Sequence, residues 1–171
     1  METTSEKTTV TPKPGAQAAD RSEGKVVIAY DGSDESRRAI DVAAQLLAPR
    51  PAVVVFVGPM PEDEGDAVLV GDLGVGDYEA IAIDEEAAQK RAVEGAELAQ
   101  KAGFSAEPNS VLATPAWMGI VDTADRVNAP VIVVGSRGLN RLRQDLEGST
   151  SHDLAHHAGR PVLIVPPGST L

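Results

Sequence analysis

The sequence predicts an α/β domain built on a doubly wound, five-stranded parallel sheet with helices on both faces. Short runs at residues 25–30, 52–57 and 130–134 are apolar almost throughout, as expected for parallel strands buried on both faces. Helix-type segments separate the strand-type segments in the order βαβαβαβαβ. Because crossovers between parallel strands are right-handed, this order leaves only doubly wound topologies.

The first half of the domain has clear start and stop signals. An Asp-Gly-Ser turn follows the first strand, and Ser33 is the predicted N-cap of a helix that runs through Leu47. This helix must end before Pro49, because proline lacks the N–H that a helix interior needs. The second strand, residues 52–57, is closed by a Gly-Pro pair. We therefore expect one β–α–β unit here.

The second half continues the alternation. Pro108 within one strand predicts an edge position, since proline cannot donate to a strand ladder. Thr114 is the predicted N-cap of the next helix, with Pro115 in its first turn. The predicted elements are a helix over 78–102, a strand over 104–112, a helix up to about 127, a strand over 130–134, a helix over 149–158 and a strand over 161–165.

The domain is expected to cover residues 25–167, between a disordered tail over 1–24 and a short tail over 168–171. Residues 1–24 are rich in Thr, Ser, Lys, Glu and Pro and lack apolar periodicity. No apolar run approaches the ~20 residues that cross a bilayer, and the N-terminus lacks the apolar core of a secretory signal. Cytoplasmic localisation is therefore the expectation.

The net charge of −11 is concentrated in one segment. Ten acidic residues and no Lys or Arg lie between Pro61 and Glu86, while the rest of the chain nearly balances. We expect an exposed acidic loop over about 61–77. Because binding to nucleic acid or to an anionic membrane needs clustered Lys and Arg, neither is expected as a partner.

The segment Gly135–Ser151 joins the fourth strand to the last helix and has the features of a phosphate cradle. Three glycines within it let the backbone turn sharply and approach a ligand closely. Its last residues, Ser149–Ser151, stand at a helix start, where free N–H groups and the helix dipole favour an anion. The residues alone leave a second interpretation open, an ordinary β–α loop with turn glycines and a capping serine.

The glycine spacing in this segment is Gly-x2-Gly-x9-Gly-Ser, which is neither a Walker loop nor the compact GxGxxG of dinucleotide folds. It resembles the ATP-binding signature of the universal stress protein family. The stretches KVVIAYDGSDESRRAI, APVIVVGSRG and GSTSHDLAHHAGRPVLIVP also resemble that family, so the likeness covers most of residues 25–166. The resemblance implies a Rossmann-like, adenine-nucleotide alpha hydrolase-like fold. It also implies a stress-response regulator that binds ATP and signals through nucleotide state and homodimerisation.

The resemblance further implies roles for individual residues. Asp31 resembles the acid that contacts the adenine–ribose end of ATP, although it could instead serve only the turn before Gly32. Ala29 and Tyr30 would line the same wall through backbone and side chain, and the last strand, Pro161 to Val165, would pair the homodimer. The implied nucleotide-binding residues are Ala29, Tyr30, Asp31, Val57, Val134, Gly135, Ser136, Arg137, Gly138, Gly148, Ser149, Thr150 and Ser151.

Other side chains keep alternative functions open. Asp145 and Glu147 would repel a triphosphate, which Mg²⁺ could offset because it prefers oxygen ligands. An interaction module that binds no nucleotide is therefore one alternative. A slow ATPase is another, although no catalytic residue is recognisable. His152 and His156 stand one turn apart, a spacing that could hold a metal, but no third ligand is evident and no metal site is expected.

Overall fold

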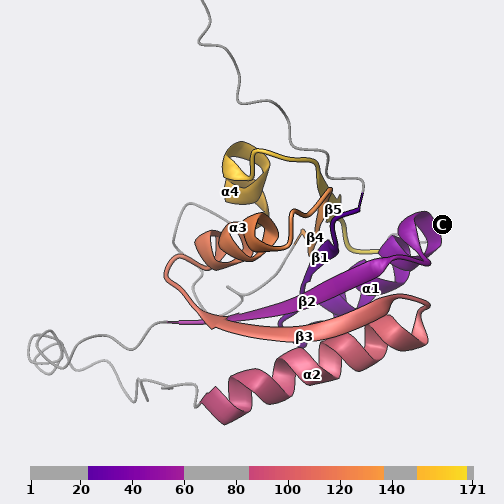
Figure 1. The fold of residues 1–171 in the computed structure, drawn as a ribbon. Helices are drawn as coiled ribbons and strands as arrows, with labels where there is room; N and C mark the ends of the chain where they lie inside the picture. Colours follow the sequence, from indigo (N-terminus) through magenta and orange to yellow (C-terminus); the bar gives the residue numbers. More distant parts are fainter. Residues whose placement is uncertain (1–22, 60–84, 137–149, 169–171) are drawn as a thin grey trace, which may run out of the picture.

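The structure, a computed structural model, describes residues 23–59, 85–136 and 150–168 (Figure 1). Within these ranges strands and helices alternate in the predicted order. The elements are β1 (Val26–Ala29), α1 (Asp34–Leu47), β2 (Pro51–Gly58), α2 (Glu85–Lys101), β3 (Ser105–Leu112), α3 (Ala116–Arg126), β4 (Ile132–Gly135), α4 (Thr150–His157) and β5 (Val162–Val165). The acidic segment over 61–77 and most of both predicted tails lie outside the described residues.

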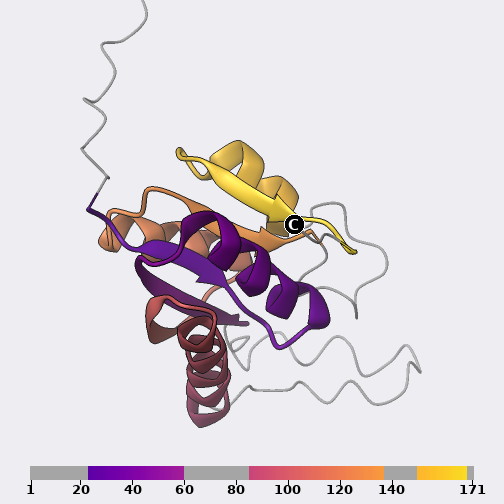
Figure 2. The ribbon, with the colours of Figure 1, turned by 90° about the vertical axis from the view of Figure 1, so that its right-hand side faces the viewer.

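The five strands form one parallel sheet in the order β3-β2-β1-β4-β5. The chain moves outward from β1 to β3 and then returns across the sheet to β4 and β5, so the strand order reverses between β1 and β4. Figures 1 and 2 show α1 and α2 on one face and α3 and α4 on the other. The doubly wound α/β prediction is confirmed, and β3, which contains Pro108, lies at an edge as predicted.

Apolar side chains pack on both faces of the sheet, as the alternation of side chains along the strands requires. From β1 and the residue after it, Val26, Ile28 and Tyr30 face α1 and α2, while Val27 and Ala29 face α3 and α4. The central strands β1, β2 and β4 are buried on both faces. This burial explains why their sequences are apolar throughout.

The helix starts agree only in part with the sequence signals. Ser33 caps α1 as predicted, because its hydroxyl oxygen accepts the N–H of Ser36 at 3.1 Å. The prediction of Thr114 as the cap of α3 is wrong, since Pro115 occupies the N-cap position and Thr114 lies one residue earlier. Proline fits there because its fixed φ matches the extended cap conformation. Among the described helices, none combines the length and apolarity that a membrane span requires.

Candidate functional site

The carboxyl ends of β1, β2 and β4 meet where the strand order reverses, the place at which open α/β sheets bind ligands. Predicted site residues lie at each of these ends and at the start of α4. The described ones are Ala29, Tyr30 and Asp31 after β1, Val57 in β2, Val134, Gly135 and Ser136 at the end of β4, and Thr150 and Ser151 in α4. Arg137, Gly138, Gly148 and Ser149 lie outside the described residues.

Three of these side chains form an apolar wall on the face of the sheet that α3 and α4 cover. Ala29, Val57 and Val134 are 6%, 4% and 4% exposed and belong to one core. They share this face because each occupies an equivalent alternating position near the carboxyl end of its strand. An apolar wall of this kind suits one face of an aromatic ring system.

The side chain of Tyr30 does not belong to the apolar wall. It lies on the opposite face, 2% exposed, against α2. Its ring fills the space that a side chain at Gly95 would need, since a Cβ atom there would lie 2.6 Å from Tyr30 Cδ1. The Tyr30 side chain therefore does not share a wall with Ala29, because adjacent residues of an extended chain point to opposite faces, and a ligand contact through it stays a prediction.

A polar network holds Tyr30 in this position. The Tyr30 hydroxyl donates to Glu94 Oε1 at 2.8 Å, and Arg37 Nη2 donates to the same oxygen at 2.5 Å. Arg91 Nη1 lies 3.3 Å from the other carboxylate oxygen. Burial and the bond to Glu94 raise the pKa of Tyr30 to about 12. The Tyr30 hydroxyl, together with Arg37, holds the pKa of Glu94 below its ordinary value.

Asp31 forms the turn between β1 and α1. Its Oδ1 accepts the N–H of Ser33 at 2.9 Å, the bond of an Asx turn. Ser36 closes the same turn, since its hydroxyl donates to the Ser33 carbonyl oxygen at 2.9 Å. The turn-forming role of Asp31 is therefore observed. A ligand contact stays a prediction and is compatible with this role, because a carboxylate has several acceptor positions.

The two ends of the predicted phosphate cradle lie side by side. Ser151 Oγ, in the first turn of α4, donates to the Ser136 carbonyl oxygen at 3.3 Å. The backbone N–H of Ser136 donates to the carbonyl oxygen of Val165, in β5, at 2.9 Å. The chain therefore leaves the sheet after β4 and re-enters α4 at one place, next to the strand-order reversal.

Gly135 has a packing reason for lacking a side chain. A Cβ atom there would lie 3.1 Å from the backbone carbonyl of Glu35, in the first turn of α1. The close approach of α1 to β4 thus accounts for this glycine without any ligand. The role in ligand approach that we expected for Gly135 stays a prediction.

The helices α1 and α4 both direct their N-termini toward this edge, but their first turns differ in charge. In α1, Asp34 and Glu35 already place carboxylates at the positive end of the helix dipole. In α4, the hydroxyl residues Thr150 and Ser151 come first, and Asp153 comes only in the fourth position. An external anion is therefore favoured at α4 over α1.

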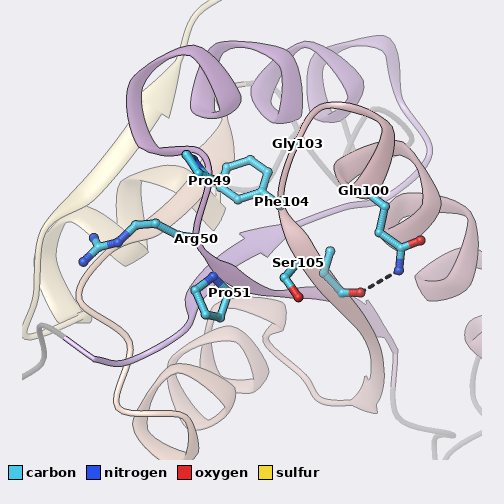
Figure 3. A pocket seen from close by; sticks show the side chains of 8 residues that line it. Pro49, Arg50, Pro51, Gln100, Gly103, Phe104 and Ser105 are labelled. Atoms are coloured by element: carbon cyan, nitrogen blue, oxygen red, sulfur yellow. Dashed lines mark hydrogen bonds between the residues drawn. The ribbon is translucent and has the colours of Figure 1, made fainter.

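A surface hollow of about 550 Å³ lies at the opposite, amino edge of the sheet (Figure 3). Residues just before and at the start of β2 and β3 line it, among them Pro49, Pro51 and Phe104. Gln100 at its rim is held by a 2.7 Å bond to the Ala106 carbonyl oxygen. None of the described site residues lines this hollow, and parallel sheets of this class bind ligands at the other edge. We therefore leave it outside the candidate site.

The fold and the position of these residues define a doubly wound α/β domain with a candidate ligand site where its strand order reverses. The profile of the universal stress protein family matches residues 24–166, and the chain belongs to this family. The universal stress protein YxiE of Bacillus subtilis is 32% identical over 146 residues, which cover 82% of this chain and 97% of that protein.

Solved structures of the family have the same fold. A universal stress protein from Archaeoglobus fulgidus, in complex with dAMP, is 25% identical with a TM-score of 0.55, over 83% of this chain and 97% of that one. A universal stress protein in complex with cAMP is 25% identical with a TM-score of 0.58, over 84% of this chain and 98% of that one.

Sequence reasoning missed the residues that hold Tyr30, namely Glu94, Arg37 and Arg91. Two signals could have pointed to them. Strand alternation places Tyr30 on the face opposite Ala29. In addition, Gly95 lies in the middle of an Ala- and Glu-rich helix, where glycine costs ~1 kcal/mol relative to alanine. Its presence there indicates that packing requires it.

Proposed function

We propose that the protein is a stress-response regulator that binds ATP, together with Mg²⁺, at the carboxyl edge of the sheet. The observation that carries this proposal is the 3.3 Å hydrogen bond from Ser151 Oγ to the Ser136 carbonyl oxygen. It joins the two ends of the glycine segment at the strand-order reversal. A helix start that lies beside a strand end can direct backbone N–H groups at phosphate oxygens.

The other groups at this edge fit an adenine nucleotide. The apolar wall supplies a surface for the base, and Asp31 supplies an acceptor for ribose hydroxyls beside the turn. Mg²⁺ would offset the repulsion between the phosphates and the carboxylates of Asp145 and Glu147, which lie outside the described residues.

The relatives support an adenine nucleotide as the ligand. The two solved universal stress proteins described above hold dAMP and cAMP, which share an adenine base and a single phosphate. We extend the ligand to ATP because the glycine spacing of this chain resembles that of ATP-binding members of the family.

Calorimetric titration of the full chain with ATP, AMP and GTP tests the proposal. ATP is expected to bind more tightly than AMP or GTP, and more tightly with Mg²⁺ than without. Ser151→Ala should weaken ATP binding about tenfold, because it removes the contact with the Ser136 carbonyl oxygen and a hydroxyl beside the charged phosphates. Ser105→Ala, an exposed serine at the opposite edge, is the matched control.

The same titrations separate the alternatives. Binding of AMP as tight as that of ATP would contradict a triphosphate site. No binding of any nucleotide would favour an interaction module, provided circular dichroism shows a folded chain. Release of ADP during incubation with Mg²⁺ and ATP would favour a slow ATPase.

We also propose that the chain forms a homodimer through β5. This strand pairs with β4 and forms an edge of the described sheet. Its Ile164 is 37% exposed, and exposed apolar edge strands invite pairing. Light scattering at micromolar concentration should give about twice the 17.8 kDa chain mass. Ile164→Lys should give a monomer, while Leu46→Lys on α1, also exposed, should not. A wild-type monomer would contradict the proposal.

A further inference from the structure

All histidines of the chain, His152, His156 and His157, lie on α4. The chain has no cysteine, so these imidazoles are its only nitrogen-heterocycle or thiolate ligands for a transition metal. His152 and His156 are exposed and one helical turn apart. Side chains with this spacing lie on the same side of a helix, so both can reach one ion from solvent.

The rings of His152 and His156 stand at the separation that a shared metal ion requires. Their centroids lie 4.6 Å apart, with the ring planes inclined by 57°. A ligating imidazole nitrogen lies about 2.0–2.1 Å from Zn²⁺, which places the ring centroid about 3.2 Å from the ion. Two such rings are about 4.5 Å apart for ligands at a right angle and about 5.2 Å apart at the tetrahedral angle. The observed separation falls within this interval.

The geometry points to a bidentate site on α4 for a late first-row divalent ion, Cu²⁺, Ni²⁺ or Zn²⁺, held by His152 and His156. His157 is not part of it, because its ring stacks on Trp117 of α3 at 5.0 Å and lies 6.4 Å from that of His156. Within the described ranges, no group of three or more His, Asp or Glu residues is arranged around one ion. The described residues thus offer two protein ligands, and Cu²⁺ is expected to bind most tightly of the three ions.

Metal binding would link successive turns of α4. A helix of this length, Thr150–His157, is not stable alone in water and depends on its surroundings. An ion held by residues four apart keeps both turns helical and so stabilises the whole element. The site stands on the histidine geometry alone and does not depend on nucleotide binding.

The single tryptophan, Trp117, gives a direct readout. It stacks on His157, the neighbour of His156, so Cu²⁺ at the pair is close enough to quench its fluorescence. The full chain is titrated with Cu²⁺ in excess Mg²⁺, which occupies the carboxylates of the acidic segment. Quenching is expected to saturate at one ion per chain. Ni²⁺ at ten times its Kd should raise the Tm by about 3–5 °C.

Substitutions of the histidines decide the assignment, with affinity measured by calorimetry as well as by fluorescence. His152→Gln and His156→Gln should each weaken Cu²⁺ binding at least about tenfold, because losing a group that merely orients a ligand already costs 10- to 100-fold. His157→Gln removes another exposed histidine of the same helix and should leave the affinity unchanged. Equal weakening by all three variants, or by none, would overturn the proposal, as would saturation at two ions per chain.

Discussion

The two faces of the sheet differ at the end of β1. On the face covered by α1 and α2, Tyr30 is buried and its hydroxyl is bound by Glu94, which also binds Arg37. On the face covered by α3 and α4, Ala29 belongs to an apolar wall near the hydroxyl of Ser151. The first face holds Tyr30, Glu94 and Arg37 in one hydrogen-bonded network, and the second combines apolar surface with polar groups at its rim. Substitutions on the first should therefore change stability, and substitutions at the rim of the second should change nucleotide binding.

Gly95→Val is expected to have the largest effect. A Cβ atom at this position would lie 2.6 Å from Tyr30 Cδ1 and 2.8 Å from Val54 Cγ1. Valine gains little helix propensity over glycine, so the clash dominates and the free energy of unfolding should fall by about 3 kcal/mol. Urea denaturation measures this, with Glu97→Val on the exposed side of α2 as control. An unchanged stability would contradict the close packing of Tyr30 against α2.

Asp31→Asn distinguishes the turn-forming role of Asp31 from a contact between its carboxylate and the ligand. Asparagine keeps an Oδ1 acceptor for the N–H of Ser33, so the free energy of unfolding should change by less than about 0.5 kcal/mol. If the carboxylate contacts the ligand, ATP affinity should fall about tenfold, since a hydrogen bond to a charged group contributes ~1.5 kcal/mol. Calorimetry and denaturation together measure both. An unchanged affinity would assign Asp31 to the turn alone.

Tyr30→Phe should lower the free energy of unfolding by about 1 kcal/mol, because it removes the bond to Glu94, and it should leave ATP affinity unchanged. The wild type should also respond to alkaline pH. The folded pKa of about 12 lies above the ordinary 10.0, so the stabilisation is full below pH 10 and declines as the pH rises through 12. Denaturation at increasing pH should show this decline in the wild type only. A weakened ATP affinity of Tyr30→Phe would indicate that the Tyr30 side chain contacts the ligand.

Glu94→Gln should have the smallest effect, below about 1 kcal/mol, because the Glu94 side chain is 36% exposed and solvent screens its ion pairs. The lowered pKa of Glu94 means that its contribution is present above the ordinary value of 4.5 and is lost as the pH falls through the folded value. The stability difference between wild type and variant should therefore shrink in acid. Glu97→Gln, at an exposed position of α2, is the control. If the free energies of unfolding of wild type and Glu94→Gln differ by a constant amount as the pH falls, the result would contradict the role of Glu94 in the network with Tyr30 and Arg37.

Much of the fold could be predicted from local patterns. The apolar runs of β1, β2 and β4 are visible in the sequence because parallel strands covered on both faces tolerate few polar residues. Ser33 was recognisable because a cap acts over three residues, here on the N–H of Ser36. The prediction of Thr114 as an N-cap failed because the same cap signal does not distinguish which of two adjacent residues begins the helix.

The candidate site was predicted less completely. The strand-order reversal and the residues that end β1, β2 and β4 followed from topology. The direction of the Tyr30 side chain did not follow from the family resemblance, because a resemblance implies a role for a residue but not the face of the sheet on which its side chain lies. The glycine spacing predicts a turn and a close ligand approach at Gly135, but its close approach to the backbone of Glu35 depends on how α1 crosses β4.

By itself, the sequence determined the order of the elements, the parallel sheet and the capped start of α1, and it predicted the edge at which a ligand would bind. These features depend on periodicity and on contacts within a few residues. Only the tertiary structure decided that Tyr30 pairs with Glu94, 64 residues away, and that the rings of His152 and His156 stand 4.6 Å apart. The physical reason is that partners of buried polar groups and distances between side chains depend on packing between elements and on rotamers, which no local pattern records.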